Sequence, residues 1–151
     1  MATFGTFTDG SVLKATEMNG MFAATTFTPV VRQSAVITNG TVHIARYLQV
    51  NKLVMCAVTL GLSSAGTANN RIEIDLPVTA KANSFNVIGS GFYFASGVVR
   101  VLRVVQYSTT RMAFFGEPAN SLTAYFGTTA GGGTTIASGS SIGAVVMYEA
   151  A

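Results

Sequence analysis

The chain has 151 residues, of which 49% are hydrophobic and only 10% are charged, and its formal net charge is +3. This length corresponds to about one domain, whereas a soluble domain usually carries roughly a quarter charged residues. So few charges leave much of the surface uncharged, and we expect other copies of the chain or other proteins to cover part of it. The nine Lys and Arg residues are scattered singly. That distribution disfavours nucleic-acid binding.

The apolar runs are too short for a membrane span. The longest, Leu53 to Leu62, is about half the length that a spanning helix needs, and it contains a threonine and a glycine. The first residues, Met1 to Thr6, lack the basic start and apolar region of a secretion signal, which predicts that the protein is made and kept in the cytosol unless it leaves by lysis. The single cysteine, Cys56, excludes an internal disulfide. Its place in the apolar run predicts a small buried hydrophobe.

Residues 1–26 are predicted to form an N-terminal arm and a short helix. Asp9-Gly10 is typical of a turn, and apolar residues recur on one helical face from Ala15 onward. Such a short helix needs a surface to dock on, and two alternatives stay open: its own β-domain, or a partner to which it anchors the subunit. The candidate attachment residues are the apolar side chains of the arm and helix, namely Phe4, Phe7, Val12, Leu13, Met18, Met21 and Phe22.

Residues 27–151 are predicted to form a single β-domain. Apolar and polar residues alternate over 41–50, residues 53–60 are almost unbroken apolar, and Asn51-Lys52 between them predicts a hairpin. The second arm should be buried on both faces. Asn39-Gly40 is a strong hairpin-turn signal. It is predicted to join a strand over 34–38 to this hairpin.

Further strands are predicted over 71–76, 85–95, 98–107, 111–115, 121–126 and 142–148, with a long mobile Gly/Thr/Ser loop over 128–141. Apolar and charged residues alternate cleanly over 71–76, which predicts that one set points into the core and the other into solvent. The predicted inward residues are Ile72, Ile74 and Leu76, and the predicted solvent-exposed residues are Arg71, Glu73 and Asp75. Frequent turn signals without alternating helices favour an all-β fold, a jelly-roll-like antiparallel β-sandwich with a short N-terminal arm and helix.

No catalytic constellation appears in the sequence. A lone histidine, His43, cannot form a metal site by itself, and a surface or interface histidine is the simpler interpretation. Glu73 and Asp75 lie two residues apart on a strand that also carries Arg71, so a solvated charged face fits better than a glycosidase carboxylate pair. The sequence therefore predicts a protein that is not an enzyme, with no cofactor and no metal.

Apolar and aromatic residues on both faces of several strands predict self-association, as a homotrimer. Arg100 and Arg103 lie three positions apart in a β-branched strand and should point to opposite faces. Two alternatives explain them: snorkelling at the sheet edges, or salt bridges across a subunit boundary to Glu73, Asp75 or Glu117. The candidate subunit-interface residues are Tyr47, Phe92, Phe94, Arg100 and Arg103.

Several short motifs together carry a family resemblance. Residues 7–19 contain the Asp-Gly turn and the pattern leucine-x-alanine-x-x-methionine-asparagine. This segment resembles the N-terminal segment of small bacteriophage virion proteins, in which a leucine usually stands at the position of Met18. Residues 39–52, 74–78 and 143–151 look like the β-domain of phage minor tail and head-surface proteins. The resemblance spans most of the chain.

The resemblance implies a non-enzymatic virion structural protein, a homotrimeric module on the virion surface that decorates the capsid or belongs to the tail. Its N-terminal segment would attach it to the major capsid or tail proteins, and assembly would take place in the host cytoplasm. The alternative is a tail receptor-binding or adhesin module that recognises the host cell surface, for example a host surface glycan. The absence of tryptophan favours the structural role, because sugar-binding sites commonly use exposed aromatic platforms.

Overall fold

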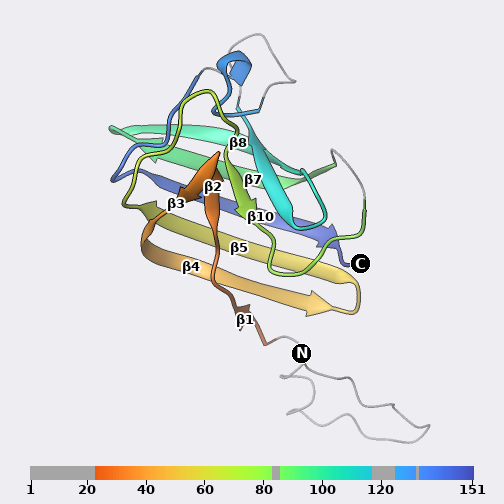
Figure 1. The fold of residues 1–151 in the computed structure, drawn as a ribbon. Coiled ribbons are helices and arrows are strands. Elements are labelled where there is room, and N and C mark those ends of the chain that lie inside the picture. The colour runs from red at the N-terminus through yellow and green to blue at the C-terminus, as the bar shows by residue number, and fades with distance from the viewer. Residues whose placement is uncertain (1–22, 83–85, 117–124, 132) are drawn as a thin grey trace, which may run out of the picture.

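A computed structural model describes residues 23–82, 86–116, 125–131 and 133–151. The predicted N-terminal helix and the seven attachment candidates lie outside these ranges. The described residues form one ten-stranded antiparallel sheet with the strand order β1-β4-β5-β10-β7-β8-β9-β6-β2-β3 (Figure 1). Their one helical element is the 3-10 turn η1 (Thr129–Gly131). The all-β class predicted from the sequence is confirmed.

The strands are long in the middle of the sheet and short toward its two ends. In chain order they are β1 (Thr25–Thr26), β2 (Val31–Gln33), β3 (Ala35–Ile37), β4 (Asn39–Val50), β5 (Leu53–Leu62), β6 (Glu73–Asp75), β7 (Val87–Ala95), β8 (Val98–Gln106), β9 (Arg111–Phe115) and β10 (Ser141–Glu149). The predicted strand over 111–115 is confirmed with the same bounds.

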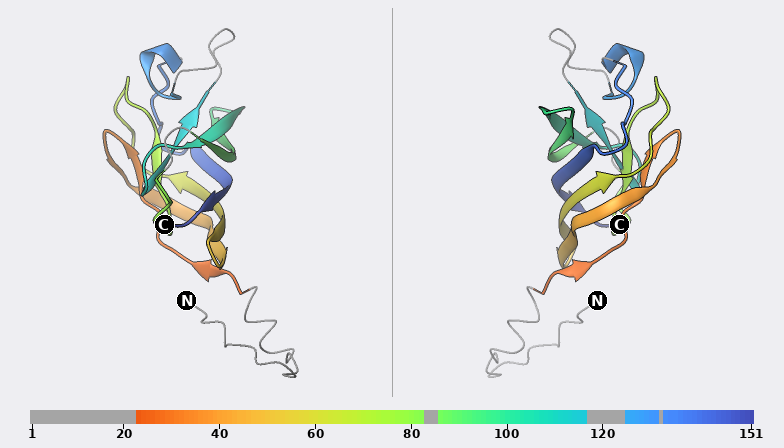
Figure 2. Two further views of the ribbon diagram at one scale, coloured as in Figure 1. Left: turned by 90° about the vertical axis from the view of Figure 1, so that its right-hand side faces the viewer. Right: turned by 90° about the vertical axis from the view of Figure 1, so that its left-hand side faces the viewer.

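The sheet curls, so that its two halves face each other across the core. In Figure 1, β4, β5, β10, β7 and β8 follow one another from bottom to top, and the β2–β3 hairpin lies in front of them. Both side views in Figure 2 place this hairpin on the opposite side of the molecule from β10. One curled sheet thus supplies the two facing layers that the sandwich prediction assigned to separate sheets.

The core lies between these two halves. Alternate residues of β5 are buried, from Val54 to Leu62, and they face the buried side chains of the other half, such as Phe114 on β9. Ile72 and Ile74 are fully buried and Leu76 nearly so, which confirms the predicted inward alternation. Apolar burial of this extent is the main force that holds a β-fold together.

The β4–β5 hairpin is present as predicted. Val50 pairs with Leu53 across the turn, and Asn51 has the positive φ of 53° that such a turn requires. The prediction that β5 is buried on both faces is wrong, because Leu53 and Met55 are 45% and 46% exposed. The core lies on only one side of this strand.

The turn predicted at Asn39-Gly40 is wrong. Both residues belong to β4, and β3 and β4 are not neighbours in the sheet. Asn39 instead pairs with Leu62 on β5. The tight turn lies at Ser34, whose φ is 72°, between the paired strands β2 and β3. Pairing with the long strand β5 has overridden the local turn preference of the dipeptide.

The long Gly/Thr/Ser segment does not match the mobile loop expected over 128–141. Ile136 in its middle is fully buried. The Ile136 carbonyl accepts a hydrogen bond from the Gly66 amide at 2.9 Å. The predicted strand over 121–126 lies mostly outside the described residues, and Tyr125 forms an isolated bridge with Phe115.

Candidate functional site

The five central strands carry a set of side chains that point away from the core. Successive residues of a strand alternate between the two faces of a sheet, so the register of β4, β5, β10, β7 and β8 fixes which residues share this side. We call them the outer face: Ile44, Arg46, Leu48, Leu53, Met55, Ala57, Thr59, Ser90, Phe92, Phe94, Val99, Val101, Arg103, Gly143, Val145 and Met147. The β2–β3 hairpin lies on the opposite side of the sheet (Figure 2).

The outer face is continuous across the strands. One row of paired positions runs from Ile44 through Thr59, Gly143 and Phe92 to Val101. Directly paired residues in adjacent antiparallel strands have Cβ atoms about 5 Å apart. At Gly143, which has no side chain, Phe92 and Thr59 of the two neighbouring strands cover the backbone.

The apolar side chains of this face are strongly exposed. Val101 is 79% exposed, Val145 is 65%, Val99 is 61% and Met147 is 51%. Single exposed hydrophobic residues are ordinary on a protein surface. A contiguous apolar patch over five strands is not, and such patches mark interaction sites.

The dimensions of the outer face suit a protein interface. Five strands spaced about 4.8 Å apart give a width of about 19 Å, and a nine-residue strand is about 30 Å long. The product is roughly 600 Å², which approaches the about 800 Å² that each partner buries in a standard interface.

A shallow groove of about 420 Å³ crosses this face. Its lining is mostly apolar and includes Leu48, Met55, Val145 and Met147. Ala24, which precedes β1, also lines it. The chain therefore enters the sheet beside the groove.

The structure separates the five predicted interface residues. Phe92, Phe94 and Arg103 lie on the outer face. Tyr47 pairs with the buried Cys56 and is half-buried, with its ring edge-on to Phe27 at 6.2 Å between centroids. Tyr47 therefore belongs to the inner side of the sheet.

Arg100 also points to the side opposite Arg103. Arg100 pairs with the buried Tyr93, whereas Arg103 pairs with the exposed Ser90. The predicted opposite orientation of the two arginines is confirmed. The interface candidates thus divide into three residues that share the outer face and two that do not.

Glu73 is not solvent-exposed, contrary to the prediction. It is only 5% exposed, and its carboxylate pairs with Arg71 through Oε1 and with Arg111 through Oε2, the latter at 3.1 Å. Asp75 pairs with Arg32. Burial of a carboxylate is tolerated here because cationic partners from neighbouring segments compensate it. Salt bridges from Arg103 of another subunit to these carboxylates would have to displace partners within the chain.

Arg71 also stacks on two aromatic rings. Its guanidinium carbon lies 3.9 Å from the ring centroid of Tyr107 and 5.8 Å from that of Tyr125, within the range of cation–π attraction. Burial raises the pKa of the Tyr125 phenol, and the charge of Arg71 opposes that rise. The ion pairs and stacking make this cluster a structural clamp between β6 and β9.

Sequence reasoning found part of the outer face and missed the rest. The exposed Met55, Val145 and Met147 were not assigned to an interface. The available sequence signal is that β10 has apolar residues at both odd and even positions. It shows that both faces are apolar but not which face is the core.

Within the described ranges, no group of three or more His, Cys, Asp or Glu residues could hold a metal ion. No helix in that part of the chain has the length and apolarity to cross a membrane. No protein-family model, no curated protein and no solved structure matches the chain.

Proposed function

We propose that this chain is a non-enzymatic structural subunit of a bacteriophage virion, which associates with further copies of itself through the outer face, as a homotrimer on the virion surface. The observation that carries the proposal is the continuous exposed apolar surface around Val101 and Val145. Burial of this surface would contribute about 25 cal/mol for each Å² of apolar area removed from water.

A second copy of the chain is the partner that fits this surface best. The two arginines of the row Arg46, Ala57, Val145, Ser90 and Arg103 lie at its two ends, on β4 and β8, with uncharged residues between them. An apolar centre with charges at the rim is the usual anatomy of a protein interface. Interfaces between identical subunits are the most apolar kind.

The virion role rests on the resemblance of residues 7–19 to the N-terminal segment of small phage virion proteins. In this proposal residues 1–26 attach the subunit to the major capsid or tail proteins, and the β-domain faces outward. The first residues of the sheet, Thr25 and Thr26, pair with Tyr47 and Arg46 on β4. The attachment segment would therefore leave the β-domain at its β4 edge.

The association is tested with a double variant, Val101→Glu with Val145→Glu, measured by sedimentation velocity at micromolar concentration. The wild-type chain should sediment as a trimer and the double variant as a folded monomer, because both side chains are exposed and their replacement leaves the core intact. Val36→Glu is the matched control. Val36 is 62% exposed but lies on β3, at the far end of the sheet. A monomeric wild-type chain, or a double variant that still forms trimers, would refute the interface.

The attachment is tested by deleting residues 1–24. The truncated chain should keep its β circular-dichroism spectrum but no longer join particles. Loss of folding would instead assign this segment to the subunit's own core. Electron microscopy of particles that carry the labelled chain measures its copy number: many trimers over the shell indicate capsid decoration, and a few at the tail end indicate a tail appendage.

A further inference from the structure

The groove on the outer face reaches the point where the chain enters the sheet. Ala24 lines it together with Leu48 on β4, Met55 on β5 and Met147 on β10. Ala24 follows only two residues after Phe22, which is the last residue before the described part of the chain. The segment that ends at Phe22 therefore starts its course beside this groove.

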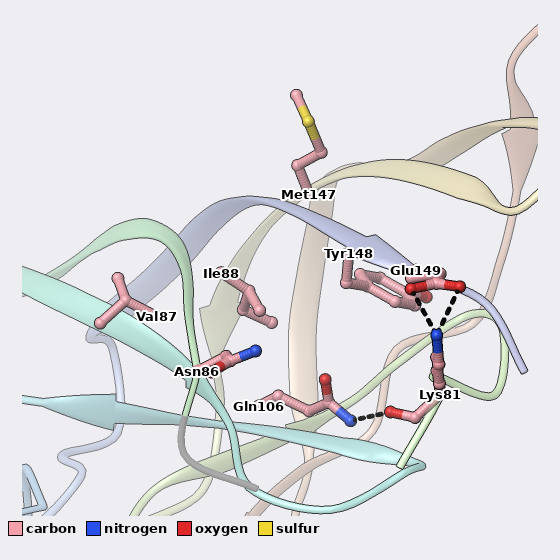
Figure 3. A pocket seen from close by; sticks show the side chains of 8 residues that line it. All are labelled: Lys81, Asn86, Val87, Ile88, Gln106, Met147, Tyr148 and Glu149. Atoms are coloured by element: carbon pink, nitrogen blue, oxygen red, sulfur yellow. Dashed lines mark hydrogen bonds and ion pairs between the residues drawn. The ribbon is translucent and has the colours of Figure 1, made fainter. Parts of the chain in front are cut away.

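Two methionines of the groove are neighbours. Met55 and Met147 are directly paired between β5 and β10, and about half of each side chain is exposed. Figure 3 shows Met147 on the opposite side of β10 from Tyr148, which is buried. A methionine side chain is flexible and polarisable, so it adapts to an irregular apolar surface that covers it. The pair is therefore suited to contact with a further apolar segment.

Residues 15–22 carry apolar side chains of the matching kind. Met18, Met21 and Phe22 recur at the spacing of one helical face. A helix of this length is not stable in water unless it docks on a surface. The groove is an apolar surface directly beside the end of this segment.

The length of the segment matches the width of the groove. The distance from β4 across β5 to β10 is two strand spacings, or about 10 Å. Eight residues span about 12 Å as a helix and about 27 Å when extended. Residues 15–22 can therefore cover the groove from Leu48 to Met147 in either conformation.

The charges of the groove and the segment are complementary. Arg46 also lines the groove, and within the described residues no carboxylate pairs with it, because Glu73, Asp75 and Glu149 pair with other cations. The segment carries the acidic residue Glu17. Docking would bring this negative charge to the side of the groove where Arg46 lies.

We propose that residues 15–22 dock in the groove of their own subunit and pack Met18, Met21 and Phe22 against its apolar lining. Ala23 alone separates Phe22 from the groove residue Ala24. Such a short tether gives the segment a high effective concentration at the groove of its own chain. A neighbouring subunit has no comparable advantage.

The docking is compatible with association through the outer face and does not rest on it. Phe92, Val99 and Val101 lie on the outer face but do not line the groove. They stay available to a second copy of the chain. Residues 1–14 stay available for the attachment to the virion.

The test is NMR of the full chain with ¹³C-labelled methionine methyl groups. The wild-type chain should show nuclear Overhauser contacts from the methyl groups of Met18 or Met21 to those of Met55 or Met147. Such contacts arise only between groups that lie close together in space. Met112 is fully buried in the core, so its methyl group is the internal reference that should show no contact with the segment.

Two matched variants locate the contact. Met147→Glu places a charge in the groove and should remove the contacts from Met18 and Met21 to Met55. Val101→Glu makes the same kind of change on the outer face but outside the groove, and it should keep them. Met147 is 51% exposed and Val101 is 79% exposed, so both changes leave the core intact.

The subunit that receives the segment is identified by refolding the labelled chain together with an excess of unlabelled chain. The intensity of the contacts per labelled chain should stay the same. A loss in proportion to the dilution would place the segment in the groove of a neighbour and overturn the proposal. Absence of the contacts in the wild-type chain, or their persistence in Met147→Glu, would overturn it as well.

Sedimentation velocity on the same samples keeps this result separate from the association. A monomeric wild-type chain that still shows the methyl contacts would refute the trimer and support the docking. A trimer without these contacts would refute the docking and leave the association in place.

Discussion

The ring of Phe92 lies over Gly143 on the outer face. The two residues are paired between β7 and β10, and a Cβ placed on Gly143 would come within 2.5 Å of Phe92 Cε1 and 3.0 Å of Phe92 Cζ. A glycine in a strand leaves room for an aromatic ring to cover the backbone. Gly143 therefore fixes where Phe92 lies on the surface that we propose as the subunit interface.

Gly143→Ala should weaken association more than it weakens the fold. The added methyl group displaces the Phe92 ring, whose far end can rotate outward, so the free energy of unfolding should fall by only about 1–2 kcal/mol. The displaced ring would disrupt the flat outer face. Urea unfolding and sedimentation velocity measure the two effects separately. Val36→Ala, on β3 at the far end of the sheet, is the control that should change neither, and full association of Gly143→Ala would contradict the proposed geometry.

The sequence predicts those elements whose signals are local. The β4–β5 hairpin follows from two apolar arms around Asn51-Lys52, and β9 follows from five residues between turn signals. Alternation in residues 71–76 also placed Ile72 and Ile74 correctly in the core. In these segments the pattern of apolar and polar residues along the chain is enough to predict the structure, and no information about distant residues is needed.

The remaining features depend on partners far away in sequence. Asn39-Gly40 became part of a strand because β5 pairs with it, and Glu73 became buried because Arg111 lies on the neighbouring strand β9. The sequence also does not indicate which face of the sheet is exposed to solvent. The run of β5 is apolar at nearly every position, so only the curl of the sheet decides that Val54 is buried and Met55 is exposed.

Gln33 should be among the most sensitive polar positions in the chain. Its fully buried side chain donates to the carbonyls of Asn70 at 3.0 Å and Thr134 at 2.8 Å, and accepts from the Ile136 amide at 2.9 Å. Gln33→Leu keeps the side-chain volume but leaves three backbone groups unpaired. The free energy of unfolding should fall by about 3 kcal/mol or more.

Urea denaturation followed by circular dichroism measures this loss. Gln49→Leu is the matched control, because that glutamine, near the end of β4, makes only an exposed bond to the Asn51 carbonyl, and its replacement should change stability by less than about 0.5 kcal/mol. Equal midpoints for the two variants would show that the Gln33 bonds contribute nothing net to stability.

Glu73→Gln tests the buried ion pairs between β6 and β9. The change keeps the size of the side chain but leaves Arg71 without its carboxylate partner and Arg111 with Asp75 alone, at 3.7 Å. Because these arginines are 38% and 41% exposed, water compensates them partly, and the loss should be about 1–3 kcal/mol. Glu149→Gln, which breaks the exposed pair with Lys81, should cost less than about 1 kcal/mol. Chemical denaturation measures the loss in the free energy of unfolding for each variant, and equal losses would contradict the structural role of Glu73.

Cys56 should be unreactive in the folded chain and should make stability depend on alkaline pH. Burial raises the pKa of its thiol from 9.0 to about 12. Below pH 9.0 the thiol is protonated in both the folded and the unfolded chain, so it adds no pH dependence there. As the pH rises from 9.0 toward about 12, the unfolded chain releases the proton and the folded chain keeps it, so stability falls.

A thiol reagent added at about pH 8 should therefore modify Cys56 only at the rate of unfolding, since the thiolate is the reacting form. Urea midpoints measured between pH 7 and about pH 11 should decline from about pH 9 in the wild-type chain. In Cys56→Ala the decline should begin later, near pH 10, because burial also raises the pKa of Tyr148 above its ordinary value of 10.0. Rapid modification of the native thiol, or the same onset of decline in both chains, would show that Cys56 is not buried as the structure places it.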